Sequence, residues 1–145
     1  MPVNTATPMR KQPVTKRKNP RSASRWKDER QFMAAVIRQC DAMIIVNPLY
    51  GEVYHVSNEN AHRNPGVRGG IPDLSLDVAR FDPVSEKTWH GWRCELKITG
   101  GKPSDLQEKK IARLRDEGYY CEVIFEEVRL VIDSLEWYLS LQRVA

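Results

Sequence analysis

Three side chains that could do chemistry together are those of Asp73, Glu95 and Lys97 in this 145-residue chain. Asp73 follows Pro72 and begins a short run in which apolar and polar residues alternate. Glu95 and Lys97 lie two residues apart in an apolar run that is typical of a strand. Residues two apart on a strand project from the same face, so Glu95 and Lys97 point together. Asp73 meets Glu95 on that face if the two strands pair.

Such a set suits a divalent metal ion. Two carboxylates and a backbone carbonyl, here that of Leu96, are hard oxygen ligands of the kind that Mg²⁺ and Mn²⁺ prefer. The amine of Lys97 beside them can orient an attacking water and offset charge that develops on a phosphorus atom. The residues therefore suggest phosphodiester hydrolysis. The alternative is structural: Asp73 caps a turn, and Glu95 forms an ion pair with Lys97.

The elements that must position these side chains can be predicted from periodicity and turn residues. The pattern predicts helices, strands and one long loop in the order α-β-β-β-α-β-α. Their expected ranges are a helix from 26 to the low forties, a strand at 53–56, a loop at 57–72, strands at 74–78 and 92–98, a helix at 104–117, a strand at 119–125 and a helix from 128 to 139. Ser104 and Gln107 form a capping box, and Gly118 ends that helix. The fold class is therefore α/β, with a small mixed sheet flanked by helices.

Charge divides the chain into two parts, 1–25 and 26–145. The first part is rich in proline and contains seven basic residues and no acid: Arg10, Lys11, Lys16, Arg17, Lys18, Arg21 and Arg25. We expect it to be a disordered arm that either contacts nucleic-acid phosphates or serves as a solubilising tail. The second part, one domain, carries 16 basic and 19 acidic residues, which is about −3 by formal charge.

Composition excludes several classes of protein. The mean hydropathy is −0.57, and no apolar run approaches the roughly 20 residues that a bilayer requires. The first residues lack the apolar stretch of a secretory signal. The three cysteines, at positions 40, 94 and 121, form no C-x-x-C pair, and their odd number argues against a disulfide framework. We therefore expect reduced thiols, no membrane association and a cytoplasmic location.

Three segments of the chain resemble the virus-type replication-repair nuclease domain, VRR-Nuc, of the PD-(D/E)xK nuclease superfamily. They are GVRGGIPDL (66–74), WHGWRCELKITGGKPSDLQ (89–107) and LRDEGYYCEVI (114–124). The resemblance covers roughly residues 26–142. It implies a restriction-endonuclease-like core of the kind found in Holliday-junction resolvases, because short members of the family from phages and bacteria resemble those enzymes and act as homodimers.

The resemblance also implies roles for single residues. Asp73 and Glu95 match the metal-binding acids of the family, and Lys97 matches its catalytic lysine. Glu29, near the start of the first helix, is the best match for a further acid, although an acid there also compensates the helix dipole. Gln107 matches a family glutamine, and the capping box explains it as well.

The expected nucleic-acid contacts include three positions outside the basic arm. Asn58 matches a family asparagine in the long loop, while Glu59-Asn60 stands where a glycine pair is common in the family. Arg68 lies in the same loop, and Lys102 lies in the glycine-rich turn before residue 104. Both are expected to contact phosphates.

These observations lead to one expected function and several alternatives. We expect a Mg²⁺- or Mn²⁺-dependent, structure-selective DNA endonuclease that acts on four-way junctions as a homodimer. The alternatives are a flap or branched-DNA nuclease in repair or restriction, and a catalytically silent DNA-binding module. His55, His62 and His90 also raise a His-Asn-His or zinc site, but their spacing matches no compact ligand motif.

Overall fold

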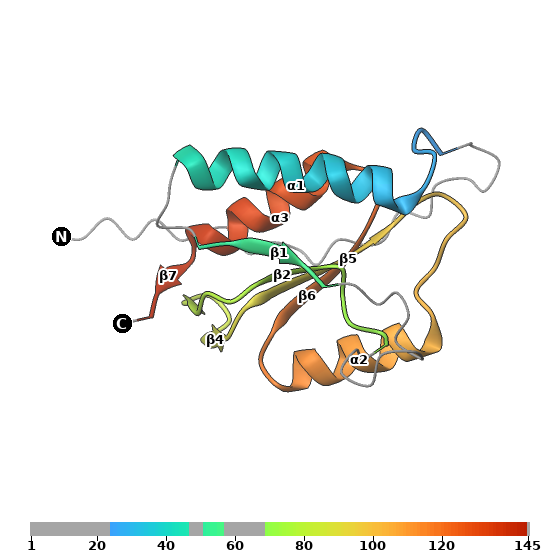
Figure 1. Ribbon diagram of the computed structural model, residues 1–145. Coiled ribbons are helices and arrows are strands. Elements are labelled where there is room, and N and C mark those ends of the chain that lie inside the picture. The colour runs from blue at the N-terminus through green and yellow to red at the C-terminus, as the bar shows by residue number, and fades with distance from the viewer. Residues whose placement is uncertain (1–23, 47–50, 57–68, 145) are drawn as a thin grey trace.

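The candidate site residues are carried by a four-stranded sheet. Its strands are β1 (Val53–His55), β2 (Leu74–Leu76), β5 (Trp92–Lys97) and β6 (Tyr120–Phe125), in the order β1-β2-β5-β6. The pairs β1–β2 and β2–β5 are antiparallel, whereas β5 runs parallel to β6. The structure is a computed structural model that describes residues 24–46, 51–56 and 69–144. The mixed sheet predicted from the sequence is confirmed, with β5 in its interior (Figure 1).

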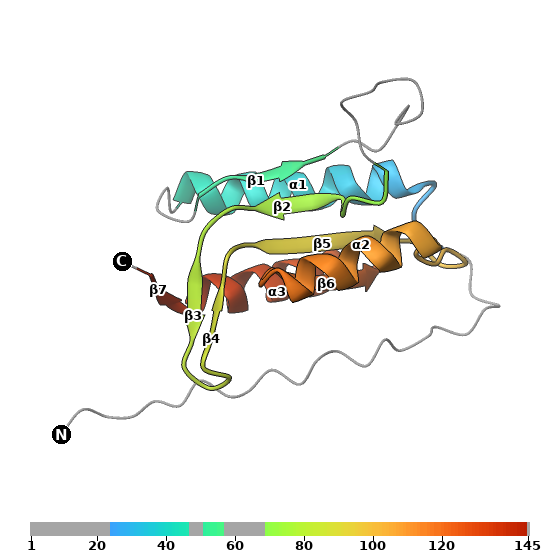
Figure 2. The ribbon, with the colours of Figure 1, turned by 90° about the horizontal axis from the view of Figure 1, so that it is seen from below.

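Helices lie on both faces of this sheet. The helices α1 (Glu29–Val46) and α3 (Val128–Ser140) cover one face, and α2 (Asp105–Asp116) lies on the other (Figures 1 and 2). Side chains at alternate positions of β5 enter the core beneath α1 and α3, where Trp92 and Leu96 are almost fully buried. The indole Nε1 of Trp92 donates to Ser134 Oγ of α3 at 3.0 Å. The intervening residues of β5, including Glu95, therefore face α2.

The parallel pairing of β5 with β6 follows from a β-α-β crossover through α2. The capping box is present. The backbone N–H of Gln107 donates to Ser104 Oγ, and the backbone N–H of Ser104 donates to Gln107 Oε1. Beyond the helix, Gly118 has φ +92°, the left-handed conformation expected of a residue that ends a helix. Both local predictions are confirmed, and together they fix where α2 begins and ends.

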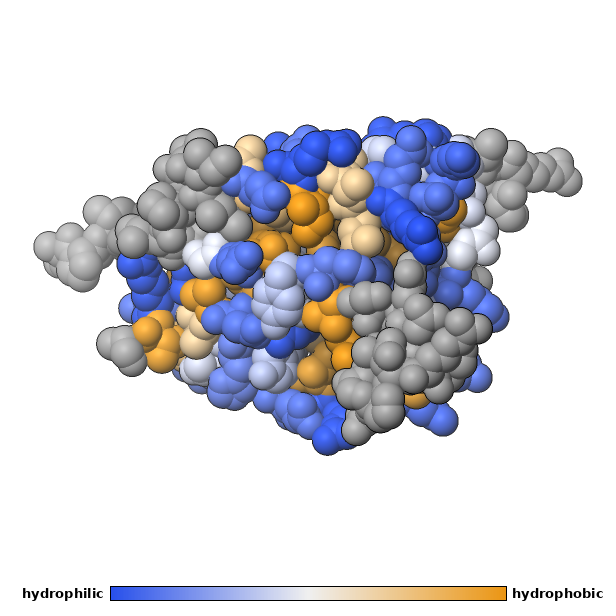
Figure 3. Space-filling view, in the orientation of Figure 1, coloured by the Kyte–Doolittle hydropathy of each residue, from blue (hydrophilic) through white to orange (hydrophobic). Residues whose placement is uncertain are grey.

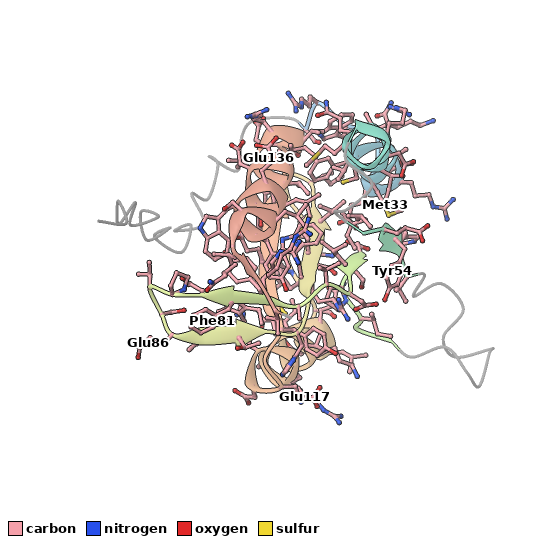
Figure 4. The ribbon with its side chains drawn as sticks, turned by 90° about the vertical axis from the view of Figure 1, so that its left-hand side faces the viewer. Met33, Tyr54, Phe81, Glu86, Glu117 and Glu136 are labelled. Carbon is pink, nitrogen blue, oxygen red and sulfur yellow. The ribbon has the colours of Figure 1, made fainter. Side chains whose placement is uncertain are left out.

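A second sheet was not predicted. The strands β3 (Arg80–Asp82), β4 (Lys87–Trp89) and β7 (Gln142–Arg143) form it in the order β4-β3-β7. A turn joins β3 to β4, in which the Asp82 carboxylate accepts from the Val84 backbone amide and the Ser85 hydroxyl. The strands on either side are too short to show a period in the sequence. The hairpin projects from the body with Glu86 near its tip (Figure 4).

The surface agrees with this layering. On the face shown in Figure 3, apolar residues gather between α1 and the sheet. Met33 and Ile37 of α1 are partly buried and pack against the core. In the described part of the chain, no helix is long and apolar enough to cross a membrane. Most of the predicted arm (1–23) and of the long loop (57–68) lies outside the described residues.

Candidate active site

Asp73 stands where the pairing of β2 with β5 breaks off. Leu74 of β2 is the register partner of Cys94 of β5. If the same register is extended by one residue, Asp73 lies opposite Glu95. If it is extended by two residues, Pro72 lies opposite Leu96. Proline has no N–H, so it cannot continue the ladder. The Asp73 carboxylate accepts the Leu96 N–H instead, at 2.8 Å. The Leu96 carbonyl lies on the same side of β5 as that N–H and receives no ladder hydrogen bond from Pro72.

Glu95 is held from two sides. Its side chain is 1 % exposed, and Lys97 Nζ lies 3.0 Å from its Oε1. Gln107 donates a second hydrogen bond to the same oxygen through Nε2. The Gln107 amide thus caps α2 with its oxygen and binds Glu95 with its nitrogen, so the two roles expected for this residue coexist geometrically.

Glu29 reaches the site through Lys97. It is the first residue of α1, its side chain is 43 % exposed, and its Oε1 lies 3.7 Å from Lys97 Nζ. The glycine-rich turn after β5 packs over this pair: a Cβ on Gly101 would lie 3.4 Å from Glu29 Oε1 and 3.6 Å from Lys97 Cδ. Lys97 is therefore 8 % exposed, although it ends its strand.

The electrostatics of the site reflect two carboxylates near one ammonium. Burial and the charge of Asp73 raise the pKa of Glu95 from 4.5 to about 7, against the opposing effect of Lys97. Burial also raises the pKa of Asp73, although the Leu96 N–H and Lys97 oppose this effect. Burial alone would lower the pKa of Lys97, but its bond to Glu95 and the charges of Glu95, Glu29 and Asp73 raise it. Additional positive charge would therefore stabilise the ionised carboxylates.

The donor set fits a divalent ion that retains several waters. Glu95 Oε2 is buried and has no hydrogen-bond partner among the described residues, so this oxygen is left for another ligand. Asp73 and the Leu96 carbonyl supply the further hard oxygen atoms. Within the described residues, no three or more His, Cys, Asp or Glu side chains form a group that could hold a metal ion. Mg²⁺ does not require such a group, because it binds through one or two carboxylates and keeps water ligands.

The predicted phosphate contacts are spread more widely. Lys102 is exposed in the loop between β5 and α2. Arg25 was expected in the free arm, but its guanidinium lies over the Trp26 ring at 5.1 Å and pairs with Glu127 at 3.5 Å. The packed body therefore begins before residue 26. The other predicted contacts lie outside the described residues: Arg10, Lys11, Lys16, Arg17, Lys18, Arg21, Asn58 and Arg68.

One residue near Asp73 was considered in the sequence only as a zinc ligand. His55 Nδ1 lies 2.8 Å from the Asp73 carbonyl oxygen, which also accepts from the Val56 amide at 3.1 Å. His90 lies elsewhere, with its ring against Tyr119. Nothing in the spacing of His55 and Asp73 signals their contact, because it depends on the pairing of β1 with β2.

Comparison with known proteins identifies the fold. No family model matches the chain, and no curated protein matches it. A solved structure described as a "VRR_NUC domain protein" superposes with a TM-score of 0.61 over 79 % of this chain and 90 % of that chain, at 22 % sequence identity. The chain thus has the fold of a VRR-Nuc domain, as the sequence resemblance implied.

Proposed function

We propose that this protein is a divalent-metal-dependent endonuclease that hydrolyses phosphodiester bonds in branched DNA. The observation that carries the proposal is the placement of Asp73 opposite Glu95, with Lys97 Nζ 3.0 Å from Glu95. The structural similarity to a VRR_NUC domain protein supports a nuclease domain. Two acids and a lysine that converge at the end of one strand can bind a metal ion and activate water.

The residues take different parts in this reaction. Asp73, Glu95 and the Leu96 carbonyl would hold Mg²⁺ or Mn²⁺. Glu29, expected as a further metal-binding acid, pairs with Lys97, and within the described residues it forms no metal-binding group with the other two acids. When bound, the ion supplies Lewis-acid polarisation of the phosphate and of the attacking water. Lys97 donates a hydrogen bond that orients this water. The water oxygen forms a bond to phosphorus as its proton passes to solvent, a P–O ester bond breaks, and the leaving oxygen takes up a proton from solvent.

Gln107 positions one of these acids. It donates to Glu95 Oε1, the oxygen that also faces Lys97, and so leaves Oε2 directed elsewhere. Its own side chain is fixed by the capping box, because the Ser104 amide donates to its oxygen at 2.8 Å. Gln107 therefore orients Glu95 without taking part in bond breaking.

The proposed substrate is a four-way DNA junction, cut by a homodimer. Cleavage of two strands of a symmetric junction requires two equivalent sites, which a two-fold interface provides. Residues 26–145 are acidic overall, whereas residues 1–24 carry six basic side chains and no acid. The arm can therefore draw DNA to a body that attracts cations. Lys102, exposed after β5, would contact phosphates.

The test is cleavage of labelled four-way junction, 5′ flap, 3′ flap, linear duplex and single strand, with Mg²⁺ or Mn²⁺ and with EDTA. Paired symmetric nicks in the junction alone, abolished by EDTA, would establish a resolvase and a dimer. Flap cutting would favour the second nuclease function. Binding without any metal-dependent cutting would contradict the enzymatic proposal and favour a DNA-binding module.

A further inference from the structure

Glu126, between β6 and α3, holds the end of the strand that carries Lys97. Its side chain is 3 % exposed, and its Oε1 accepts the Thr99 N–H. Its own backbone N–H donates to the Lys97 carbonyl at 2.9 Å. Glu126 thus binds the backbone on both sides of Ile98, which joins β5 to the glycine-rich turn.

The same residue also binds the segment that leads into α1. Its carbonyl accepts from Trp26 Nε1 at 2.8 Å and from Arg25 Nη2 at 3.3 Å. Trp26 in turn stacks on Phe32 of α1, with ring centroids 5.5 Å apart. Glu126 therefore links the strand end bearing Lys97 to the helix start bearing Glu29, the two residues that face each other at 3.7 Å.

The backbone at this position makes glutamate an unfavourable choice. Its φ is +63°, a left-handed conformation that glycine adopts without strain and a glutamate does not. Burying a carboxylate also costs free energy unless hydrogen bonds compensate it. The bond to the Thr99 N–H supplies such compensation. Both the backbone conformation and the buried charge of Glu126 cost free energy, so a glutamate at this position indicates that its carboxylate has a specific role.

We propose that Glu126 is a positioning residue of the candidate active site. By fixing Thr99 it holds the turn in which Gly101 packs over Lys97 and Glu29, and so keeps the Lys97 ammonium against Glu95. This inference rests on the proposed nuclease function for its catalytic consequence. Its geometric part, the hydrogen bond to Thr99, is independent of any activity.

Three variants of the full chain separate the side-chain role from the backbone. Glu126→Gly suits a positive φ and removes the side-chain acceptor of the Thr99 N–H, so the variant should fold. Glu126→Gln keeps an oxygen that can accept from Thr99. Glu127→Gln is the matched control, because Glu127 adjoins Glu126 and forms an ion pair with Arg25. Amide hydrogen exchange, followed by NMR without metal or DNA, should show Thr99 protection reduced about tenfold or more in Glu126→Gly alone.

Cleavage kinetics on the preferred DNA then test the catalytic consequence. Glu126→Gly should lower kcat on the order of tenfold or more with KM nearly unchanged, because a small displacement of a catalytic group slows the chemical step. Glu126→Gln should retain most of the activity, and Glu127→Gln should match the wild type. Unchanged Thr99 protection, or unchanged kcat, in Glu126→Gly would overturn the positioning role. If the wild type cleaves no DNA, the proposed function fails and the catalytic role fails with it, while hydrogen exchange still decides the contact.

Discussion

Without metal, the stability of this protein should fall as the pH rises from about 4.5 to about 7. The cause is Glu95, whose pKa is raised from 4.5 to about 7, chiefly by burial. In that window the folded state binds more protons than the unfolded state, so raising the pH favours unfolding. At about 1.4 kcal/mol per pH unit, Glu95 should lower the free energy of unfolding by about 3 kcal/mol across the window. The side chain is 1 % exposed, so solvent does little to reduce this effect.

Urea denaturation in EDTA at several pH values between 4.5 and 8 measures this quantity. Glu95→Gln is neutral throughout, so the difference in unfolding free energy between wild type and variant isolates the ionisation of Glu95. We expect this difference to shift against the wild type by about 3 kcal/mol over the range. Adding Mg²⁺ at pH 8 should stabilise the wild type and not the variant. A difference that does not change with pH would refute the assigned burial and electrostatics of Glu95.

Three other predictions concern binding and helix capping. Asp73→Asn should weaken Mn²⁺ binding measured by electron paramagnetic resonance, and wild-type affinity in this variant would remove Asp73 from the metal site. Ser104→Ala should lower the free energy of unfolding by about 1 kcal/mol, measured by denaturant unfolding, and leave cleavage unchanged. Gln107→Ala should lower stability and also slow cleavage, because it releases Glu95. Equal cleavage by both variants would contradict the positioning of Glu95 by Gln107. Deleting residues 1–23 removes six basic side chains and should flatten the slope of log K against log salt by up to about 5, measured by fluorescence anisotropy. An unchanged slope would indicate a solubilising tail.

Local chemistry made much of the site predictable. The alternation that begins at Asp73 and the apolar run around Glu95 predicted two strands, and the proline before Asp73 stands at the beginning of the first of them. Their pairing is observed, and it brings the two carboxylates to the same face. The capping box likewise predicted Gln107 at the start of α2, and the structure shows its amide nitrogen turned toward Glu95 of β5. The catalytic and metal-binding roles of these residues stay predictions.

Contacts between distant segments were not predictable from the sequence. β7 contributes only two residues and is defined by pairing with β3, some sixty positions earlier. Arg25 lies at the end of a basic segment and looks like part of it in the sequence. In the structure it packs on Trp26 and pairs with Glu127. Glu126 resembles any surface acid until the fold brings Thr99 to it. In each case the deciding partner is remote in the chain, so neither periodicity nor spacing reveals it.

The most direct test of the proposed active site compares two lysines of the same sequence pattern. Lys97 and Lys110 each end a Glu-x-Lys triplet, but only Lys97 lies on a strand beside its glutamate; Lys110 is on α2. Residues two apart on a helix diverge by about 200° and cannot share a site. With Mg²⁺ and labelled four-way junction, Lys97→Met should abolish cleavage while retaining DNA binding, and Lys110→Met should cleave as the wild type does. Normal cleavage by Lys97→Met would contradict the assignment of the active site.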